Sequence, residues 1–321
     1  MNMSKIGEKI GRLKLKDKIV YICFLLLLAI FAVILRDTNF LSGDNLMNIL
    51  RQTAMISVMA VGMTFVISAA EIDLSISSVV AFSALVAAKI LEVTDSVALA
   101  VTAALGVGFV VGAVNGLLTT KMRIPSFLVT LGTQSIVLGV ARIFTDLEAV
   151  PIVNSTFNNV FGSGDIGPIS SLFIWTLVIV VIGHIVYRKT RFGRAVLAVG
   201  GNKSAARYSG IRTDRIRVLV MIIGAMTASF AALLYSGRLH GARYTLGEND
   251  VMNVIAAVVI GGTSFTGGRG TIVGALFGSI IMGILNNGLL LMGLSVSGQM
   301  IARGIVIILA VSLSLREKKS E

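Results

Sequence analysis

The sequence has few charged residues for its length, and this shortage excludes a water-soluble globule. Only 14% of its 321 residues are charged, whereas 55% are hydrophobic. The mean hydropathy is +0.90. A typical soluble domain carries about 25% charged residues. Because so much apolar surface is stable only in a lipid bilayer, the composition predicts an integral membrane protein.

Cysteine and histidine are also scarce. The single cysteine, Cys23, lies in the first apolar run, so an intrachain disulfide or a cysteine-based metal site cannot form. His184 and His240 are far apart in sequence, and the chain has no HExxH motif of the kind that binds zinc on a helix. We therefore expect no catalytic site, no metal site and no cofactor, and an intramembrane enzyme is the disfavoured class.

Long apolar runs follow one another along the whole chain. Each spanning helix needs about 20 residues, so this length accommodates about ten spans. The runs predict an all-α fold with spans near 19–35, 50–70, 74–91, 97–118, 125–144, 170–187, 217–237, 251–265, 271–292 and 298–315. The run 251–265 is short, and only the acidic EID at 71–73 interrupts 50–91.

Basic residues are distributed unevenly between the connections. With the N-terminus in the cytoplasm, 21 of the 28 basic residues fall on the cytoplasmic side, mostly in residues 1–18 and 188–217. Such loops stay in the cytoplasm, so an even number of spans with both termini inside is expected. Residues 19–315 then form the transmembrane domain and residues 316–321 a cytoplasmic tail. The net charge of +12 reflects this topology, and we expect the lipid bilayer rather than nucleic acid as partner.

The longest connection on the opposite side is 145–169, which has no lysine or arginine. Loops of this length are often functional, and an ordinary solvated loop is the alternative.

Two similar short segments suggest an internal repeat. GAVNGLL at 112–118 is similar to GILNNGLL at 283–290, with one inserted asparagine. The two segments fall in the fourth and ninth expected spans, which run in opposite directions through the membrane. This is how an inverted repeat of five plus five helices looks in a sequence. A chance match of one short motif is the alternative.

The segment 188–217 is the largest polar island and is too basic to cross the bilayer. Within it, Asn202 suits a helix N-cap, and Ala205 and Ala206 are strong helix formers. Gly210 is well placed to end this helix in a left-handed turn. Small residues on a short exposed helix let another protein approach closely. A juxtamembrane basic loop held against anionic lipid is the alternative.

Four segments together resemble one known family. They are GGNKSAARYSGI at 200–211, EIDLSISS at 71–78, IPSFLVTLGT at 124–133 and IAAVVIGGTSFTGGRGTIVGALFGSIIMGILNNGLLLMGLS at 255–295. In this order they resemble the ribose-type monosaccharide permease subunits of bacterial ATP-binding-cassette importers. The resemblance runs from about residue 40 to the C-terminus.

The resemblance implies a non-enzymatic permease subunit in the bacterial inner membrane. Its expected partners are a second permease subunit in a homodimer or heterodimer, a periplasmic or lipid-anchored sugar-binding protein, and a cytoplasmic ATPase that hydrolyses the ATP. The residues expected to couple to that ATPase are Gly201, Asn202, Ala205, Ala206, Arg207 and Gly210. The family usually has Gly-Gly before IDLS, where this chain has Ala69-Ala70-Glu71, and such departures leave the particular sugar open.

Polar residues inside the apolar runs are candidates for the translocation path. Intramembrane carboxylates are costly and are functional hypotheses by default. The candidates are Glu71, Asp73, Ser75, Ser78, Asn115 and Asn286. In the alternative interpretation, Asp73 caps a helix that starts at Leu74, and the asparagines hydrogen-bond between helices. A second function also stays open, namely a stand-alone secondary transporter with Glu71 and Asp73 as its ion-coupling site.

The glycine-rich stretch GGTSFTGGRGT at 261–271 superficially resembles a phosphate-binding loop. A Walker motif needs a lysine after its second glycine, but Gly268 stands at that position and an apolar segment precedes the stretch. We therefore expect a tight turn with close helix approach instead of a nucleotide site. The spacing of Gly274 and Gly278 likewise predicts close helix packing.

Overall fold

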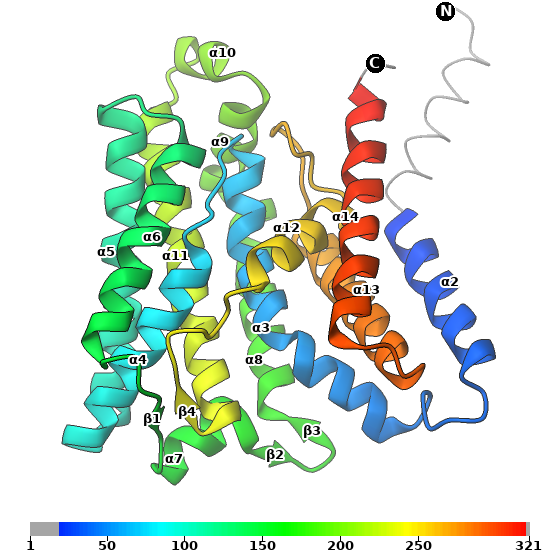
Figure 1. Cartoon of the computed structure of the whole chain (residues 1–321). Coiled ribbons are helices and arrows are strands. Elements are labelled where there is room, and N and C mark those ends of the chain that lie inside the picture. The colour runs from blue at the N-terminus through cyan, green and yellow to red at the C-terminus, as the bar shows by residue number, and fades with distance from the viewer. Residues whose placement is uncertain (1–18, 319–321) are drawn as a thin grey trace, which may run out of the picture.

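The computed structural model describes residues 19–318 and consists almost entirely of helices (Figure 1). Seven described helices are long and apolar enough to cross a membrane: α3 (Gly43–Ser68), α4 (Ile76–Thr94), α5 (Val97–Lys121), α6 (Ser126–Phe144), α8 (Ser171–Lys189), α11 (Thr213–Leu239) and α13 (Ile272–Leu291). The chain is thus a multi-pass, all-α membrane protein, as its composition predicts. The expected basic N-terminus, 1–18, and residues 319–321 of the tail lie outside the described residues.

Three further helices lie at the positions of the remaining expected spans: α2 (Ile19–Ile34), α12 (Asp250–Ile260) and α14 (Val296–Lys318). Helix α12 has only 11 residues. At 1.5 Å per residue it rises about 16 Å, roughly half of the hydrocarbon core. This corrects the expected span 251–265, because the helix stops where the glycine-rich turn begins.

Helix α3 also begins earlier than the apolar run predicts, at Gly43 rather than near residue 50. The Ser42 side chain accepts a hydrogen bond from the Asn45 backbone N–H at 3.2 Å and so caps the helix. The first turns of α3 are polar, and hydropathy alone does not reveal a helix that extends beyond the apolar core.

Helix α11 occupies the centre of the bundle and packs along α5, α3 and α4. Buried glycines allow its close approach to α5: Gly108, Gly112 and Gly116 stand four residues apart on one face. A Cβ on Gly112 would lie only 2.6 Å from the Cα of Ile222 in α11. Such small-residue spacing lets membrane helices pack backbone to backbone.

The expected close packing around Gly274 and Gly278 is confirmed. A Cβ on Gly274 would lie 1.9 Å from the carbonyl oxygen of Gly261, and one on Gly278 would lie 2.0 Å from that of Ala257. These two glycines therefore seat α13 against the short helix α12 and the turn after it.

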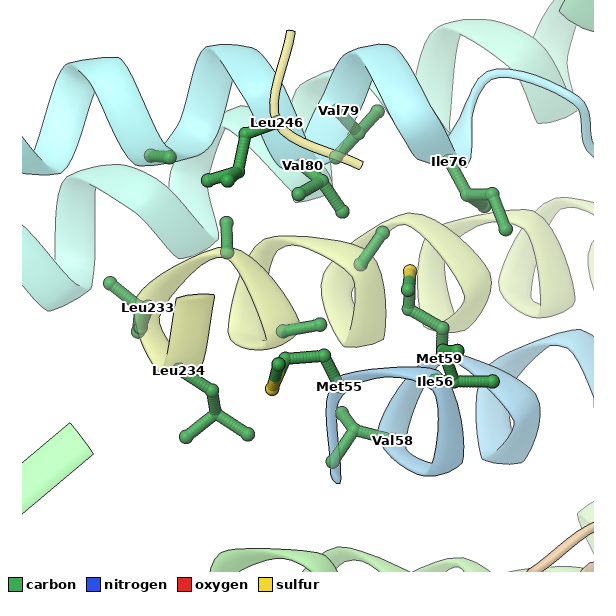
Figure 2. Close-up of a cluster of buried hydrophobic side chains, with 14 of the residues drawn as sticks. Met55, Ile56, Val58, Met59, Ile76, Val79, Val80, Leu233, Leu234 and Leu246 are labelled. Atoms are coloured by element: carbon green, nitrogen blue, oxygen red, sulfur yellow. The ribbon is translucent and has the colours of Figure 1, made fainter. Parts of the chain in front are cut away.

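A hydrophobic core joins α3, α4 and α11 (Figure 2). Its buried side chains include Met55, Met59, Val79, Val80, Leu233 and Leu234. The flexible thioethers of the methionines fill the irregular spaces between the three helices. This core fixes the relative position of α3 and α4 and thereby holds the non-helical segment between them inside the bundle.

Short elements gather at the two ends of the bundle (Figure 1). Helices α9 (Arg191–Gly201) and α10 (Lys203–Tyr208) lie at one end. The opposite end carries α7 (Ser155–Asn158), the π-helix η1 (Asn159–Ser163) and two small antiparallel pairs, β1 (Val150–Pro151) with β4 (Gly241–Ala242) and β2 (Asp165–Ile166) with β3 (Ile169–Ser170). The basic segment 188–217 and the connection 145–169 therefore lie at opposite ends.

The connection 145–169 is a structured cap. Phe157 and Phe161 are buried in it, and the Phe161 ring stacks on Trp175 of α8 with centroids 5.7 Å apart. At its edge, Val150 pairs with Ala242, which ties the connection to the end of α11.

Candidate functional site

Helix α10 forms where the sequence predicts it. The Asn202 side-chain oxygen accepts a hydrogen bond from the Ala205 backbone N–H at 2.9 Å. At the other end, Gly210 has φ +82°, and the Ile211 N–H bonds back to the Ala206 carbonyl at 3.0 Å. The predicted N-cap and the predicted left-handed turn are both confirmed, because each uses only contacts within a few residues.

Most of α10 projects from the body of the protein. Among the residues expected to couple to an ATPase, Gly201, Asn202, Ala205, Arg207 and Gly210 are exposed, whereas Ala206 is buried. The most exposed large hydrophobic side chain in this region is Tyr208, which is 92% exposed. The sequence alone does not single out Tyr208, because a tyrosine at the end of a short helix suits packing as well as binding.

An open hollow of about 610 Å³ lies beside α10. Its walls are formed by residues 119–121 and 123–125, and by Lys203, Arg207, Asp214 and Arg217. Five of these residues are cations and only Asp214 is an anion. The surface next to α10 is therefore strongly positive and suits an acidic partner.

The glycine-rich turn 261–271 packs directly against the C-terminal end of α9. Gly267 and Gly268 both have positive φ, and the Gly268 N–H donates to the Ser68 carbonyl at 3.0 Å. A Cβ on Gly200 would lie 1.8 Å from that same carbonyl oxygen and 2.8 Å from the Gly268 nitrogen. The expected tight turn with close approach is confirmed, and it joins the end of α3 to α9.

The segment 69–75 between α3 and α4 is not helical. The Asp73 Oδ1 accepts hydrogen bonds from the Ser75 N–H at 2.9 Å and from the Ser75 hydroxyl at 2.6 Å. The helix therefore begins at Ile76 instead of Leu74, and Asp73 stabilises the turn that leads into it. This corrects the expected cap: the N-cap residue of α4 is Ser75, no side chain caps the helix, and the Asp73 carboxylate bonds to Ser75 instead.

Three of the expected path residues meet in one buried cluster. The Asn115 side-chain N–H donates to the Ser75 hydroxyl at 2.9 Å, which links α5 to the Asp73 turn. Asp73, Ser75 and Asn115 are all 0% exposed. Ser78 lies one turn further on and donates to the Ser75 carbonyl at 2.8 Å. In this conformation the cluster connects helices instead of lining an open passage.

The asparagines of α13 lie apart from this cluster. Asn287 exchanges two hydrogen bonds with Asn45 of α3, each 3.0 Å long. This confirms that interhelical bonding accounts for at least one of the intramembrane amides. Asn286 is half-buried on α13, which packs along α3 and α12.

Glu71 has a partner that the sequence did not reveal. Its Oε1 contacts the Nε of Arg217 in α11, and both side chains are largely buried, 6% and 14% exposed. Arg217 belongs to the basic segment 188–217 and was counted there only among the basic residues that indicate the topology. The two residues are 146 positions apart, so no local pattern predicts the pair.

We expect Asp73→Asn to cost less than about 1 kcal/mol of unfolding free energy, because it keeps the acceptor for both Ser75 donors. Asp73→Ala removes this acceptor and is expected to cost about 2 kcal/mol, since buried donors are left unpaired. Thermal unfolding of the two variants in detergent compares these costs. Loss of transport in Asp73→Asn with stability retained would contradict a purely structural role.

The amino-acid sequence of the chain matches a known protein family. The profile of the family described as branched-chain amino acid transport system / permease component matches residues 45–311. The chain belongs to this permease family. The structured core from α3 to α14 is thus the permease component itself, and the resemblance noted from the four motifs is confirmed.

Individual relatives extend over nearly the whole chain. The ribose import permease protein of Escherichia coli K12 is 40% identical over 294 residues, which cover 90% of this chain and 91% of the relative. That of Bacillus subtilis is 39% identical over 294 residues, with 91% of each chain covered. The galactose/methyl galactoside import permease protein of Escherichia coli K12 is 33% identical, with 97% of each chain covered. No solved structure matches the chain.

Membership in this family makes the chain a transport permease subunit. The names of its relatives support the importer interpretation over the stand-alone transporter with Glu71 and Asp73 as an ion-coupling site. The partner of Glu71 agrees with this choice, because its carboxylate is already paired with Arg217.

Proposed function

We propose that this permease is the membrane subunit of a bacterial ATP-driven importer for a monosaccharide of the ribose type. It works in the inner membrane with a cytoplasmic ATPase, a sugar-binding protein on the outer side and a second permease subunit. The permease forms the path, and the ATPase supplies the energy. The observation that carries this proposal is α10, an exposed, capped helix at the basic end of a family permease.

Three features of α10 support docking of the ATPase there. The caps at Asn202 and Gly210 hold the helix rigid, which lowers the entropic cost of binding. Tyr208 offers an exposed aromatic anchor of the kind that dominates protein interfaces. The cationic hollow beside the helix adds charge complementarity to an acidic partner, which speeds association.

The topology proposed from the basic residues has ten helices, two cytoplasmic termini and a repeat of five plus five. In such a repeat, α3, α4 and α5 correspond to α11, α12 and α13. The packing supports this correspondence, because α5 packs along α11 and α13 packs along α3. Likewise α4 contacts α5, as α12 contacts α13. Alternating access in such folds is a movement of one repeat against the other.

The choice of sugar belongs to the binding protein in this proposal. Relatives of comparable similarity are named for ribose, galactose and arabinose, so overall identity does not separate these sugars. Small polar side chains such as Ser75, Ser78, Asn115 and Asn286 suit a path that holds its solute weakly. Glu71 and Asp73 contribute to the shape of this path by holding the segment between α3 and α4.

A crosslinking experiment tests the proposal. In a Cys23→Ser background, a cysteine introduced by Lys203→Cys should crosslink to the ATPase and react with impermeant maleimide only from the cytoplasmic side. Uptake of labelled ribose should require ATP and persist when ion gradients are collapsed. Labelling of this cysteine from outside intact cells would contradict the proposed topology. Uptake without the ATPase would contradict the assignment as an ATP-driven importer.

A further inference from the structure

The buried ion pair Glu71–Arg217 joins two parts of the molecule that the backbone keeps far apart. Glu71 lies in the non-helical segment 69–75, and Arg217 is the fifth residue of α11. Three residues earlier on the same helix, the Asp214 carboxylate lies 3.8 Å from the Lys203 ammonium at the start of α10. The first turns of α11 thus contact α10 through one ion pair and the segment 69–75 through another.

The N–H groups of Ala69, Ala70 and Glu71 donate to backbone carbonyls of α3. The second half of the segment 69–75 is bonded to side chains of other helices. The Ile72 N–H donates to the Ser126 hydroxyl and the Leu74 N–H to the Thr130 hydroxyl, both at 3.1 Å. Its Ser75 bonds to Asn115 of α5. Residues between two helices can absorb changes in φ and ψ, so a movement of this segment need not disrupt α3 or α4.

The ion pair lies at the boundary between this segment and the cationic hollow. Arg217 lines the hollow together with Lys203 and Arg207 of α10. Removing one partner of a buried ion pair leaves the other charge uncompensated, so the two charges strongly favour moving together. A displacement of α10 that shifts the start of α11 therefore acts on Glu71 directly.

We propose that Glu71 and Arg217 are positioning residues that transmit movement of α10 to the start of α4. The contacts run from Lys203 to Asp214, from Arg217 to Glu71, and then to the turn of Asp73 and Ser75, which is bonded to α5. The proposal rests on the proposed docking of the ATPase at α10. It assigns Glu71 a mechanical role in coupling and gives it no contact with the transported sugar.

The test follows the segment itself and needs no knowledge of the sugar. In the Cys23→Ser background, Ile72→Cys places a reporter next to Glu71, and its rate of maleimide labelling is measured in membranes that contain the ATPase, with and without ATP. We expect ATP to change this rate in the parent protein. Glu71→Gln and Arg217→Gln should reduce the ATP effect about tenfold while the ATPase still copurifies and hydrolyses ATP. The exchange Glu71→Arg with Arg217→Glu should restore most of the effect.

Asp165→Asn is the matched control, because it removes an ion pair with Arg51 at the opposite end of the bundle. It should leave the ATP effect unchanged. A parent protein that does not bind the ATPase overturns the proposed docking. An ATP effect on the labelling rate that is as large in the Glu71→Gln variant as in the parent overturns the role of the pair. If the single variants and the exchange variant all fail to accumulate, the pair serves folding, and the transmission role is rejected.

Discussion

Tyr208→Ala is expected to weaken binding of the ATPase about 30-fold. Truncation of an aromatic residue that is a hot spot of an interface costs about 2 kcal/mol or more, and about 1.4 kcal/mol corresponds to a factor of ten. Tyr208 is the exposed large hydrophobic side chain of α10, and no other aromatic residue stands on this helix. Uptake driven by ATP should fall in parallel, because the proposed energy source is no longer held against the permease.

The measurement is the affinity of the detergent-purified permease for the ATPase, determined by titration at constant salt. Ser204→Ala provides the control, since Ser204 is an exposed small residue of the same helix. It should change the affinity by less than about twofold, as exposed substitutions away from special features usually do. Unchanged ATPase affinity in Tyr208→Ala would show that α10 is not the docking surface.

Gly200→Ala is expected to destabilise the protein by about 3 kcal/mol, near the upper end of the usual cost of overpacking. Its new methyl group would meet the Ser68 carbonyl oxygen at 1.8 Å and the Gly268 nitrogen at 2.8 Å, and both are backbone atoms. A flexible side chain could change its rotamer to make room, but these backbone atoms cannot. Helix α9 must therefore move away from α3 and from the glycine-rich turn. The junction that supports α10 would then be lost together with stability.

The neighbouring Gly201→Ala is the matched control for stability. A Cβ on Gly201 would meet only the Gly268 Cα, at an ordinary 3.8 Å. Its cost should stay within about 0.5 kcal/mol. The midpoint of thermal unfolding in detergent should fall by several degrees for Gly200→Ala and hardly change for Gly201→Ala. Equal effects of the two substitutions would contradict the claim that close backbone approach holds this junction.

The junction also explains the glycine-rich stretch that resembles a nucleotide site. Gly268, which stands where a phosphate-binding lysine is required, donates its backbone N–H to Ser68 of α3. A side chain at Gly267 would meet Ala70 and the Gly200 carbonyl, each at 2.8 Å. These glycines are required by the close approach of three protein segments, and in the proposed function the nucleotide is bound by the ATPase subunit.

Features that depend on composition or on contacts within a few residues can be predicted from the sequence alone. The excess of apolar residues requires a bilayer, whatever the arrangement of the helices. The α10 helix could be predicted because Asn202 caps it through a hydrogen bond to Ala205, three residues away. The tight turn at 261–271 follows in the same way from glycines that adopt positive φ.

Contacts between distant segments become visible only in the folded molecule. The partnership of Glu71 with Arg217 and that of Ser75 with Asn115 depend on how α5 and α11 pack against the segment between α3 and α4. The exposure of Tyr208 depends on that packing too. Helix packing is set by side-chain fit across the whole bundle, and a single sequence read locally does not contain it.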